Sequence, residues 1–201
     1  MKVGILGGTF NPIHNGHIKL GVEAARQLAL NHVLVMPSAN PPHKAGTCIV
    51  DAKHRSAMVR IAVEPYPELV FSDFELQREG IIYSADTLAL LKAEHPENEY
   101  YFIIGADSLF SIEKWYHPEK VMEFCYLVAA GRNQQNMAAL KKQQDYLTEK
   151  YNAKIELLEF PDIPISSTMI REKVAAGEAI AAYVPEAVAL YMAENNLYVA
   201  R

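Results

Sequence analysis

Two histidines lie three residues apart, directly after a pair of glycines near the amino end of the chain. The segment reads Gly7-Gly8-Thr9-Phe10-Asn11-Pro12-Ile13-His14-Asn15-Gly16-His17. The glycines allow backbone N–H groups to approach a ligand without an intervening side chain. A helix is expected to begin near Gly16, so its positive end, His14 and His17 would face the same crevice. Imidazoles, backbone donors and a helix amino terminus together form a site for an anion, and phosphate is the expected anion.

A second group of phosphate-binding residue types lies near the other end of the chain. It reads Ile165-Ser166-Ser167-Thr168-Met169-Ile170-Arg171. Hydroxyls at a helix start can be simple N-caps, but Arg171 follows Ser167 and Thr168 by one helical turn. Hydroxyls, free N–H groups and a guanidinium would then converge on one point, which suits a second phosphate. Together the two segments indicate a polyphosphate that is held at both ends.

Other phosphate-binding and catalytic motifs do not fit these residues. A dinucleotide-binding turn needs G-x-G-x-x-G and an acid after the second strand, where this chain has Pro37-Ser38-Ala39-Asn40. The Gly-Lys-Ser/Thr of a Walker A loop and the G-x-S-x-G of a hydrolase elbow are absent. His14 and His17 have no third zinc ligand nearby in sequence, so we predict no metal site formed by the protein alone.

The elements that must position these segments alternate between strand and helix patterns. Apolar runs typical of buried parallel strands span residues 3–6, 33–36, 69–74, 100–104, 126–130 and 155–158. Helices are expected over residues 16–30, 52–64, 86–94, 167–176 and 185–195, the last with proline first, and 132–154 reads as a solvated surface helix. The alternation predicts an α/β fold with a doubly wound, mostly parallel sheet. Ligands bind such sheets beyond the carboxyl ends of the strands, where both phosphate segments would lie.

Composition sets the broad class of the protein. Of 201 residues, half are hydrophobic and 21% are charged, with a net charge of −5, which fits one globular domain over residues 1–201. Residues 166–201 would form a small helical part of that domain. The acidic balance argues against a nucleic-acid partner. We expect a cytoplasmic protein without membrane association, because no long apolar run or signal-peptide pattern occurs. Cys48 and Cys125 are expected to be reduced thiols.

The first segment resembles the signature of the nucleotidylyltransferase superfamily, and residues 165–171 resemble its second signature, Ser-Ser/Thr-x-x-Arg. Further segments narrow the resemblance to the bacterial nicotinate-mononucleotide adenylyltransferases. They are Pro37-x-x-x-Pro41-Pro42-His43-Lys44, Arg55-x-x-Met58, Tyr83-Ser84-Ala85-Asp86-Thr87-Leu88, Ile103-Ile104-Gly105-Ala106-Asp107-Ser108, Trp115-Tyr116, and the tail from Tyr183-Val184-Pro185 to Leu197-Tyr198. The chain departs from the family at Asn11, where aspartate is usual, at Ile81-Ile82 and at Ser84.

This resemblance implies a Rossmann-like nucleotidyltransferase fold and an enzyme that transfers AMP from ATP to nicotinate mononucleotide. The products are nicotinate adenine dinucleotide and pyrophosphate, on the route to NAD. The phosphate of the mononucleotide is the nucleophile, so no covalent enzyme intermediate is required. Mg²⁺ is expected to arrive with ATP, because the site offers few carboxylates. The resemblance leaves a homo-oligomer open.

The resemblance also implies roles for individual residues. The catalytic residues would be His14, His17 and Arg171. ATP would contact Gly8, Thr9, Phe10, His17, Gly105, Asp107, Ser167, Thr168 and Arg171. The mononucleotide would contact Asn40, Lys44, Tyr83, Ser84, Trp115 and Tyr116. Next to phosphate, both histidines are expected to be protonated. Arg55 and Met58 are interpreted as structural.

Two alternatives stay open at this point. One is another adenylyltransferase with a small acceptor, either nicotinamide mononucleotide or phosphopantetheine. Trp115 and the segment 41–44 argue against phosphopantetheine. The other is a non-catalytic nucleotide-binding module with the same fold, against which the two histidines and Arg171 speak.

Overall fold

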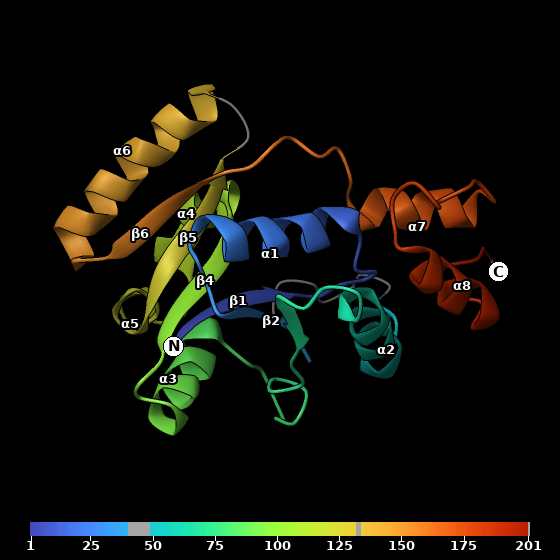
Figure 1. Ribbon diagram of the computed structural model, residues 1–201, viewed down its shortest axis with the longest axis horizontal. Helices are drawn as coiled ribbons and strands as arrows, with labels where there is room; N and C mark the ends of the chain where they lie inside the picture. The colour runs from blue at the N-terminus through green and yellow to red at the C-terminus, as the bar shows by residue number, and fades with distance from the viewer. Residues whose placement is uncertain (40–48, 132–133, 201) are drawn as a thin grey trace.

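A computed structural model describes residues 1–39, 49–131 and 134–200 and arranges them around one parallel sheet (Figure 1). Its six strands are β1 (Lys2–Gly8), β2 (His32–Pro37), β3 (Leu69–Phe71), β4 (Glu99–Gly105), β5 (Cys125–Gly131) and β6 (Lys154–Glu159). Their order across the sheet is β3-β2-β1-β4-β5-β6, and all neighbours are parallel. The order changes direction between β1 and β4, so the predicted doubly wound α/β fold is confirmed.

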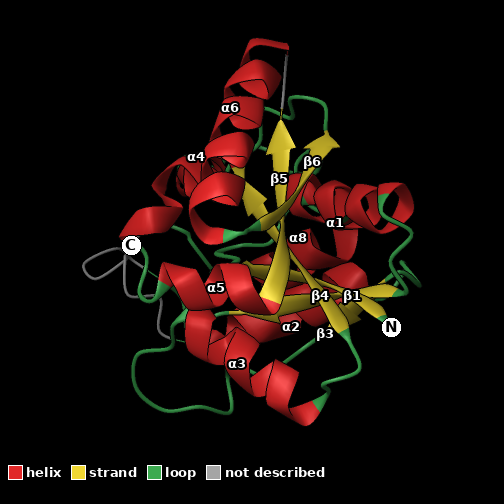
Figure 2. Cartoon of the chain, turned by 90° about the vertical axis from the view of Figure 1, so that its left-hand side faces the viewer, coloured by secondary structure: helices red, strands yellow, loops and turns green. Residues whose placement is uncertain are grey.

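Helices cover both faces of this sheet (Figure 2). They are α1 (Asn15–Gln27), α2 (Ala52–Val63), α3 (Ser84–Glu94), α4 (Ala106–Ser111), α5 (Pro118–Phe124), α6 (Gln134–Tyr151), α7 (Ser167–Ala175) and α8 (Glu186–Glu194), with a 3₁₀ turn η2 (Ile112–Lys114) after α4. Within the described ranges, no helix combines the length and apolarity needed to cross a membrane.

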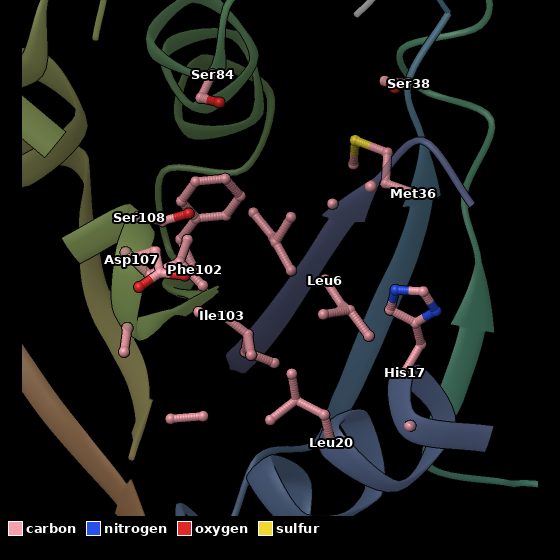
Figure 3. Close-up of a pocket in the computed structure, with 18 of the residues that line it drawn as sticks. Leu6, His17, Leu20, Met36, Ser38, Ser84, Phe102, Ile103, Asp107 and Ser108 are labelled. Atoms are coloured by element: carbon pink, nitrogen blue, oxygen red, sulfur yellow. The ribbon is translucent and has the colours of Figure 1, made fainter. Parts of the chain in front are cut away.

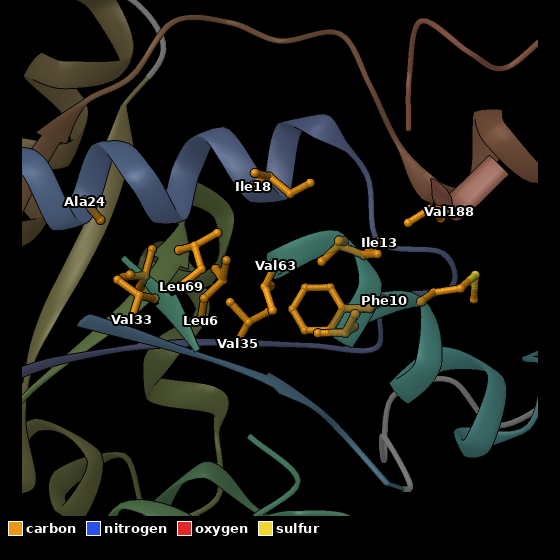
Figure 4. Close-up of a cluster of buried hydrophobic side chains, with 14 of the residues drawn as sticks. Leu6, Phe10, Ile13, Ile18, Ala24, Val33, Val35, Val63, Leu69 and Val188 are labelled. Atoms are coloured by element: carbon orange, nitrogen blue, oxygen red, sulfur yellow. The ribbon is translucent and has the colours of Figure 1, made fainter. Parts of the chain in front are cut away.

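Two core clusters lie on opposite faces of the sheet. Alternation along β1 sends Leu6 into the first cluster and Ile5 into the second, as expected for a strand buried on both faces. The first cluster contains residues of α1, α2, α7 and α8, and the second contains residues of α3 to α6. Figure 4 shows the first cluster, with Ile18 and Ala24 of α1 over Val33 and Val35 of β2. Val188 of α8 belongs to the same cluster, so the C-terminal helices share a core with the sheet.

The predicted strands and long helices are present, with ends that differ by a few residues. The extended segment expected over 69–74 ends as a strand at Phe71. Pro185 is the N-cap of α8 rather than its first helical residue, because its ψ of 143° is extended. The helix expected to be solvated, α6, buries Leu140 and Leu147, seven positions apart on one face. The pieces α4, η2 and α5 were not predicted, because each spans fewer than eight residues and shows no clear period.

Candidate active site

A cavity of about 950 Å³ opens at the carboxyl ends of β1 and β4. Its walls include Gly7 and Gly8 from β1, Gly105 from β4, and Met36 and Ser38 from β2 and the residues after it. Figure 3 shows side chains from both halves of the sheet facing one another across this space. Doubly wound sheets bind ligands at this point, and the volume suits a nucleotide-sized ligand.

The two histidines stand at the start of α1, on one side of the cavity. Their rings stack with centroids 3.6 Å apart and planes at 25°. The backbone N–H of His14 donates a hydrogen bond to Nδ1 of His17 over 3.3 Å. An accepting Nδ1 carries no proton, so the proton of the His17 ring is on Nε2. His17 therefore presents a neutral N–H donor at the cavity wall (Figure 3).

His14 is neutral in the free protein. Its side chain is almost fully buried, and this burial lowers the pKa of His14 to about 4. Within the described part of the chain, His14 Nδ1 has no hydrogen-bond partner. The expectation that phosphate favours the charged rings concerns the complex with ATP and stays a prediction, in which the attraction of the phosphate must exceed the cost of burying the charge.

The second phosphate segment meets the first at this edge of the sheet. The Ser167 hydroxyl donates to the carbonyl of Pro12 over 2.8 Å. Nη1 of Arg171 donates to the carbonyl of Asn11 over 2.9 Å, and its Nη2 donates to the Thr168 hydroxyl over 3.2 Å. The bonds to Pro12 and Asn11 join residues that lie 155 and 160 positions apart in the chain. The start of α7 is thereby held against the loop that precedes α1.

The structure brings most, but not all, of the predicted site residues into one cavity. Those that line it are Gly8, His14, His17, Tyr83, Ser84, Gly105, Asp107, Trp115, Tyr116 and Ser167. Four predicted residues are not part of its lining, namely Thr9, Phe10, Thr168 and Arg171. Arg171 instead faces the backbone of the loop, and the Phe10 ring is buried in the first core cluster. Asn40 and Lys44 lie outside the described residues.

Helices α1, α3 and α7, together with the short helix α4, direct their amino ends at the cavity. The N-caps of α1, α3 and α7 are His14, Tyr83 and Ser166, and all three line it. Unpaired N–H groups give a helix amino end a partial positive charge. The cavity can therefore attract an anion although the chain as a whole has a net charge of −5.

Aromatic side chains form the end of the cavity next to α3. Tyr83 and Tyr116 stack with centroids 4.2 Å apart, and Tyr116 is 47% exposed. The Trp115 ring meets Phe102 edge-on at 6.2 Å and packs against the second core cluster. Trp115 therefore serves the core and the cavity wall together. Flat apolar surfaces of this kind suit an aromatic ring.

Several cavity residues were missed by the sequence reasoning. Glu75 lies in a turn-rich segment without a recognisable motif; it accepts a hydrogen bond from the Thr87 hydroxyl over 2.9 Å, and burial raises the pKa of Glu75. Ser38 and Ser108 also line the cavity. Both could have been found, since Ser38 follows β2 directly and Ser108 lies in the first turn of α4. Across the described ranges, no group of three His, Cys, Asp or Glu is placed to hold a metal ion.

Similarity to known proteins extends over nearly the whole chain. The model of the cytidylyltransferase-like family matches residues 5–173. A probable nicotinate-nucleotide adenylyltransferase of Lachnoclostridium phytofermentans is 44% identical over 197 residues, covering 98% of both chains. Its counterpart in Clostridium novyi is 39% identical with the same coverage. The solved structure of Plasmodium falciparum nicotinic acid mononucleotide adenylyltransferase complexed with NaAD gives a TM-score of 0.80 over 98% of this chain and 97% of that one. At 22% identity, this is a likeness of fold.

Proposed function

The chain belongs to the cytidylyltransferase-like family and, within it, to the nicotinate-nucleotide adenylyltransferases, and from this premise we propose the reaction that its cavity performs. The enzyme transfers AMP from ATP to nicotinate mononucleotide. Nicotinate adenine dinucleotide and pyrophosphate are the products.

One observation carries this proposal above the others. The Ser167 hydroxyl bonds to the Pro12 carbonyl, and Ser167, His14 and His17 line the same cavity. Donors from both ends of the chain therefore surround one space. A triphosphate is the ligand that needs donors at both of its ends.

The reaction is a displacement at the α-phosphorus of ATP. An oxygen of the mononucleotide phosphate forms the new bond, and the bond from the α-phosphorus to the α,β-bridging oxygen breaks. Pyrophosphate leaves with that electron pair. The attacking phosphate is already an anion near neutral pH, so the reaction needs no protein nucleophile and no general base.

The chain supplies alignment and charge stabilisation instead. Holding two reactants in line can contribute roughly 7–11 kcal/mol to lowering the barrier. We assign the Nε2–H of His17 to a non-bridging oxygen of the α-phosphoryl group, where negative charge develops. His14, Ser167 and the amino end of α7 would hold the outer phosphates. Arg171 would act through the loop that it binds, because its guanidinium contacts Asn11 rather than the cavity.

The cavity fits a Mg²⁺ ion that arrives bound to ATP. Glu75 and Asp107 are the two carboxylates in its lining, too few to form a metal cage without phosphate oxygens. The ion would therefore be held chiefly by the phosphate oxygens of ATP and by water. Bound to the triphosphate, Mg²⁺ supplies charge neutralisation for the leaving group.

The aromatic end of the cavity would receive the mononucleotide. Tyr83, Trp115 and Tyr116 offer faces and edges to the pyridine ring, and the amino end of α3 offers N–H groups to its carboxylate. Gly105 and Asp107 would lie against the adenosine sugar and base. We propose that residues 1–201 act as one domain in the cytoplasm, with ATP and nicotinate mononucleotide as partners and no nucleic acid.

A paired assay tests the proposal. Pyrophosphate release is measured with ATP, Mg²⁺ and either nicotinate or nicotinamide mononucleotide, and the dinucleotide is identified by mass. We expect faster turnover with the nicotinate substrate, because the amino end of α3 favours a carboxylate. Equal or faster turnover with the amide would contradict the assignment of the acceptor.

A further inference from the structure

Arg55 is a buried cation that binds the backbone of three separate segments. It lies on α2 with 2% of its surface exposed. Its Nη1 donates to the carbonyls of Thr9 and Ser38 over 2.8 and 2.7 Å. Its Nη2 donates to Ala39 over 3.1 Å, and its Nε donates to Val50 over 3.2 Å. Only a planar fork of several donors can satisfy so many acceptors at once.

Two of these segments are the loops that border the phosphate end of the cavity. Thr9 follows β1 directly, between Gly8 and Phe10, and Ser38 follows β2. Gly8 and Ser38 both line the cavity. The guanidinium therefore ties together the loops after two neighbouring strands without itself lining the cavity.

The hydrogen bond from Arg55 to the Thr9 carbonyl also restrains the next residue, Phe10. The carbonyl of Thr9 and the N–H of Phe10 belong to one peptide group, so a cation on the oxygen orients that group and strengthens its N–H as a donor. Phe10 has a φ of 47°, a left-handed conformation that is costly for a bulky residue. Such a conformation persists only where the surroundings hold it, and the Thr9 contact with Arg55 is one such restraint.

The charge of Arg55 is not cancelled by a contacting acid. Among the described residues, no carboxylate lies within ion-pair distance of it. Burial lowers the pKa of Arg55, and Asp51 and Tyr198 act on it only through space. A buried cation bound only to carbonyl oxygens keeps much of its field, which favours an anion in front of the loop.

We propose that Arg55 is a positioning residue for ATP, which holds the loops after β1 and β2 together and so fixes the cavity wall at Gly8 and Ser38. This inference rests on the proposed function, in which ATP fills the cavity. It replaces the purely structural role that the sequence suggested for Arg55. The ligand class concerned is a nucleoside triphosphate.

Two substitutions and one control test this role. Arg55→Lys keeps the charge but loses the fork, and Arg55→Met loses both. Val59→Ala, one turn later on α2 and equally buried, removes core volume but no hydrogen bond to the loops. For each folded variant, the Kd of ATP with Mg²⁺ is measured by calorimetry, together with kcat, the KM of ATP and the Tm.

We expect Arg55→Lys to weaken ATP binding and to lower kcat/KM for ATP at least tenfold, and Arg55→Met to lower both further. Val59→Ala should lower the Tm while its ATP affinity stays within twofold of wild type. Arg55 variants with lower Tm but near-normal ATP affinity and kcat/KM would show a structural role only and overturn the proposal.

A measurement on the wild-type chain covers the case in which neither variant folds. The ¹⁵N–¹H signals of the Gly8 and Ser38 amides should move when ATP binds, and unmoved signals would overturn the proposal. A failure of the proposed reaction can be distinguished from a failure of the role proposed for Arg55. If the wild type binds ATP but releases no pyrophosphate with any acceptor, the reaction is wrong, whereas the role of Arg55 is still decided by ATP affinity.

Discussion

At the scale of single residues, the histidine pair offers hydrogen-bond donors to an anion without two adjacent positive charges. The His14 backbone directs the proton of His17 to Nε2, and burial keeps the His14 ring neutral. Stacked rings at a centroid distance of 3.6 Å would repel each other if both were charged. The sequence predicted the pair but not the neutral state of His14, since the burial of His14 arises only in the folded chain.

His17→Ala should lower kcat at least about a hundredfold, because it removes a donor to the charge that develops on the α-phosphoryl group. The fold should survive, since the His17 ring is only partly buried. The matched control is His32→Ala at the opposite end of the sheet, which should leave kcat unchanged. Pyrophosphate release and far-UV circular dichroism measure the two effects. A His17→Ala enzyme with wild-type turnover would refute this role.

His14 should make the free energy of unfolding depend on pH. The unfolded chain takes up a proton at His14 near its ordinary pKa of 6.5, whereas the folded chain does so only near 4. Stability attributable to this group is therefore present above pH 6.5 and is lost as the pH falls towards 4. At about 1.4 kcal/mol per unit, the loss has a ceiling of about 3 kcal/mol.

The comparison is between wild type and His14→Gln, followed by urea unfolding from neutral pH to about pH 4. The neutral glutamine should flatten the dependence by an amount up to that ceiling. Parallel curves for the two proteins would contradict the neutral state assigned to His14.

At the scale of elements, the site depends on how α7 and α8 dock. Asn15 N–H donates to the Tyr183 carbonyl over 2.9 Å, and His54 on α2 meets the Tyr191 hydroxyl on α8 at 3.0 Å. The hydroxyl residues at the start of α7 and the proline at the start of α8 helped to predict both helices from the sequence. It could not give these contacts, because no local pattern encodes which surface a terminal helix covers. The short elements α4, η2 and α5 were not predicted at all, because each is too short to show a helical period in its sequence.

Arg171→Ala should raise the KM of ATP roughly tenfold, with a smaller effect on kcat. The substitution removes a charge-assisted hydrogen bond to Asn11, of the order of 1.5–3 kcal/mol, and loosens the start of α7 against the phosphate loop. Lys173→Ala is the control, since that lysine of α7 pairs with Glu178 away from the loop. An unchanged KM in Arg171→Ala would count against the second phosphate segment.

Met192→Ala should destabilise the whole protein by about 2–5 kcal/mol, since it opens a cavity in the first core cluster. Leu190→Ala on the same helix is the control, because Leu190 is 58% exposed and should cost little. If residues 1–201 form one domain, chemical denaturation of Met192→Ala should show one cooperative transition at lower denaturant. A separate early transition for α8 would contradict the single-domain proposal.

At the scale of the whole molecule, the fold follows from the alternation of apolar runs and helical segments, and the strand order places both phosphate segments at one edge. Most residues chosen for the site do line one cavity, since they follow strand ends or begin helices. Arg55 shows what sequence alone cannot supply. Its motif was recognised, yet its bonds to Thr9, Ser38 and Ala39 depend on three segments that meet only in the folded chain.

A stoichiometric assay with the purified full chain, ATP, Mg²⁺ and nicotinate mononucleotide decides whether the proposed transfer of AMP takes place. We predict one pyrophosphate released for each nicotinate adenine dinucleotide formed, with both products lost together in His17→Ala. Tight ATP binding without either product, or hydrolysis of ATP to AMP in place of dinucleotide formation, would contradict the central claim.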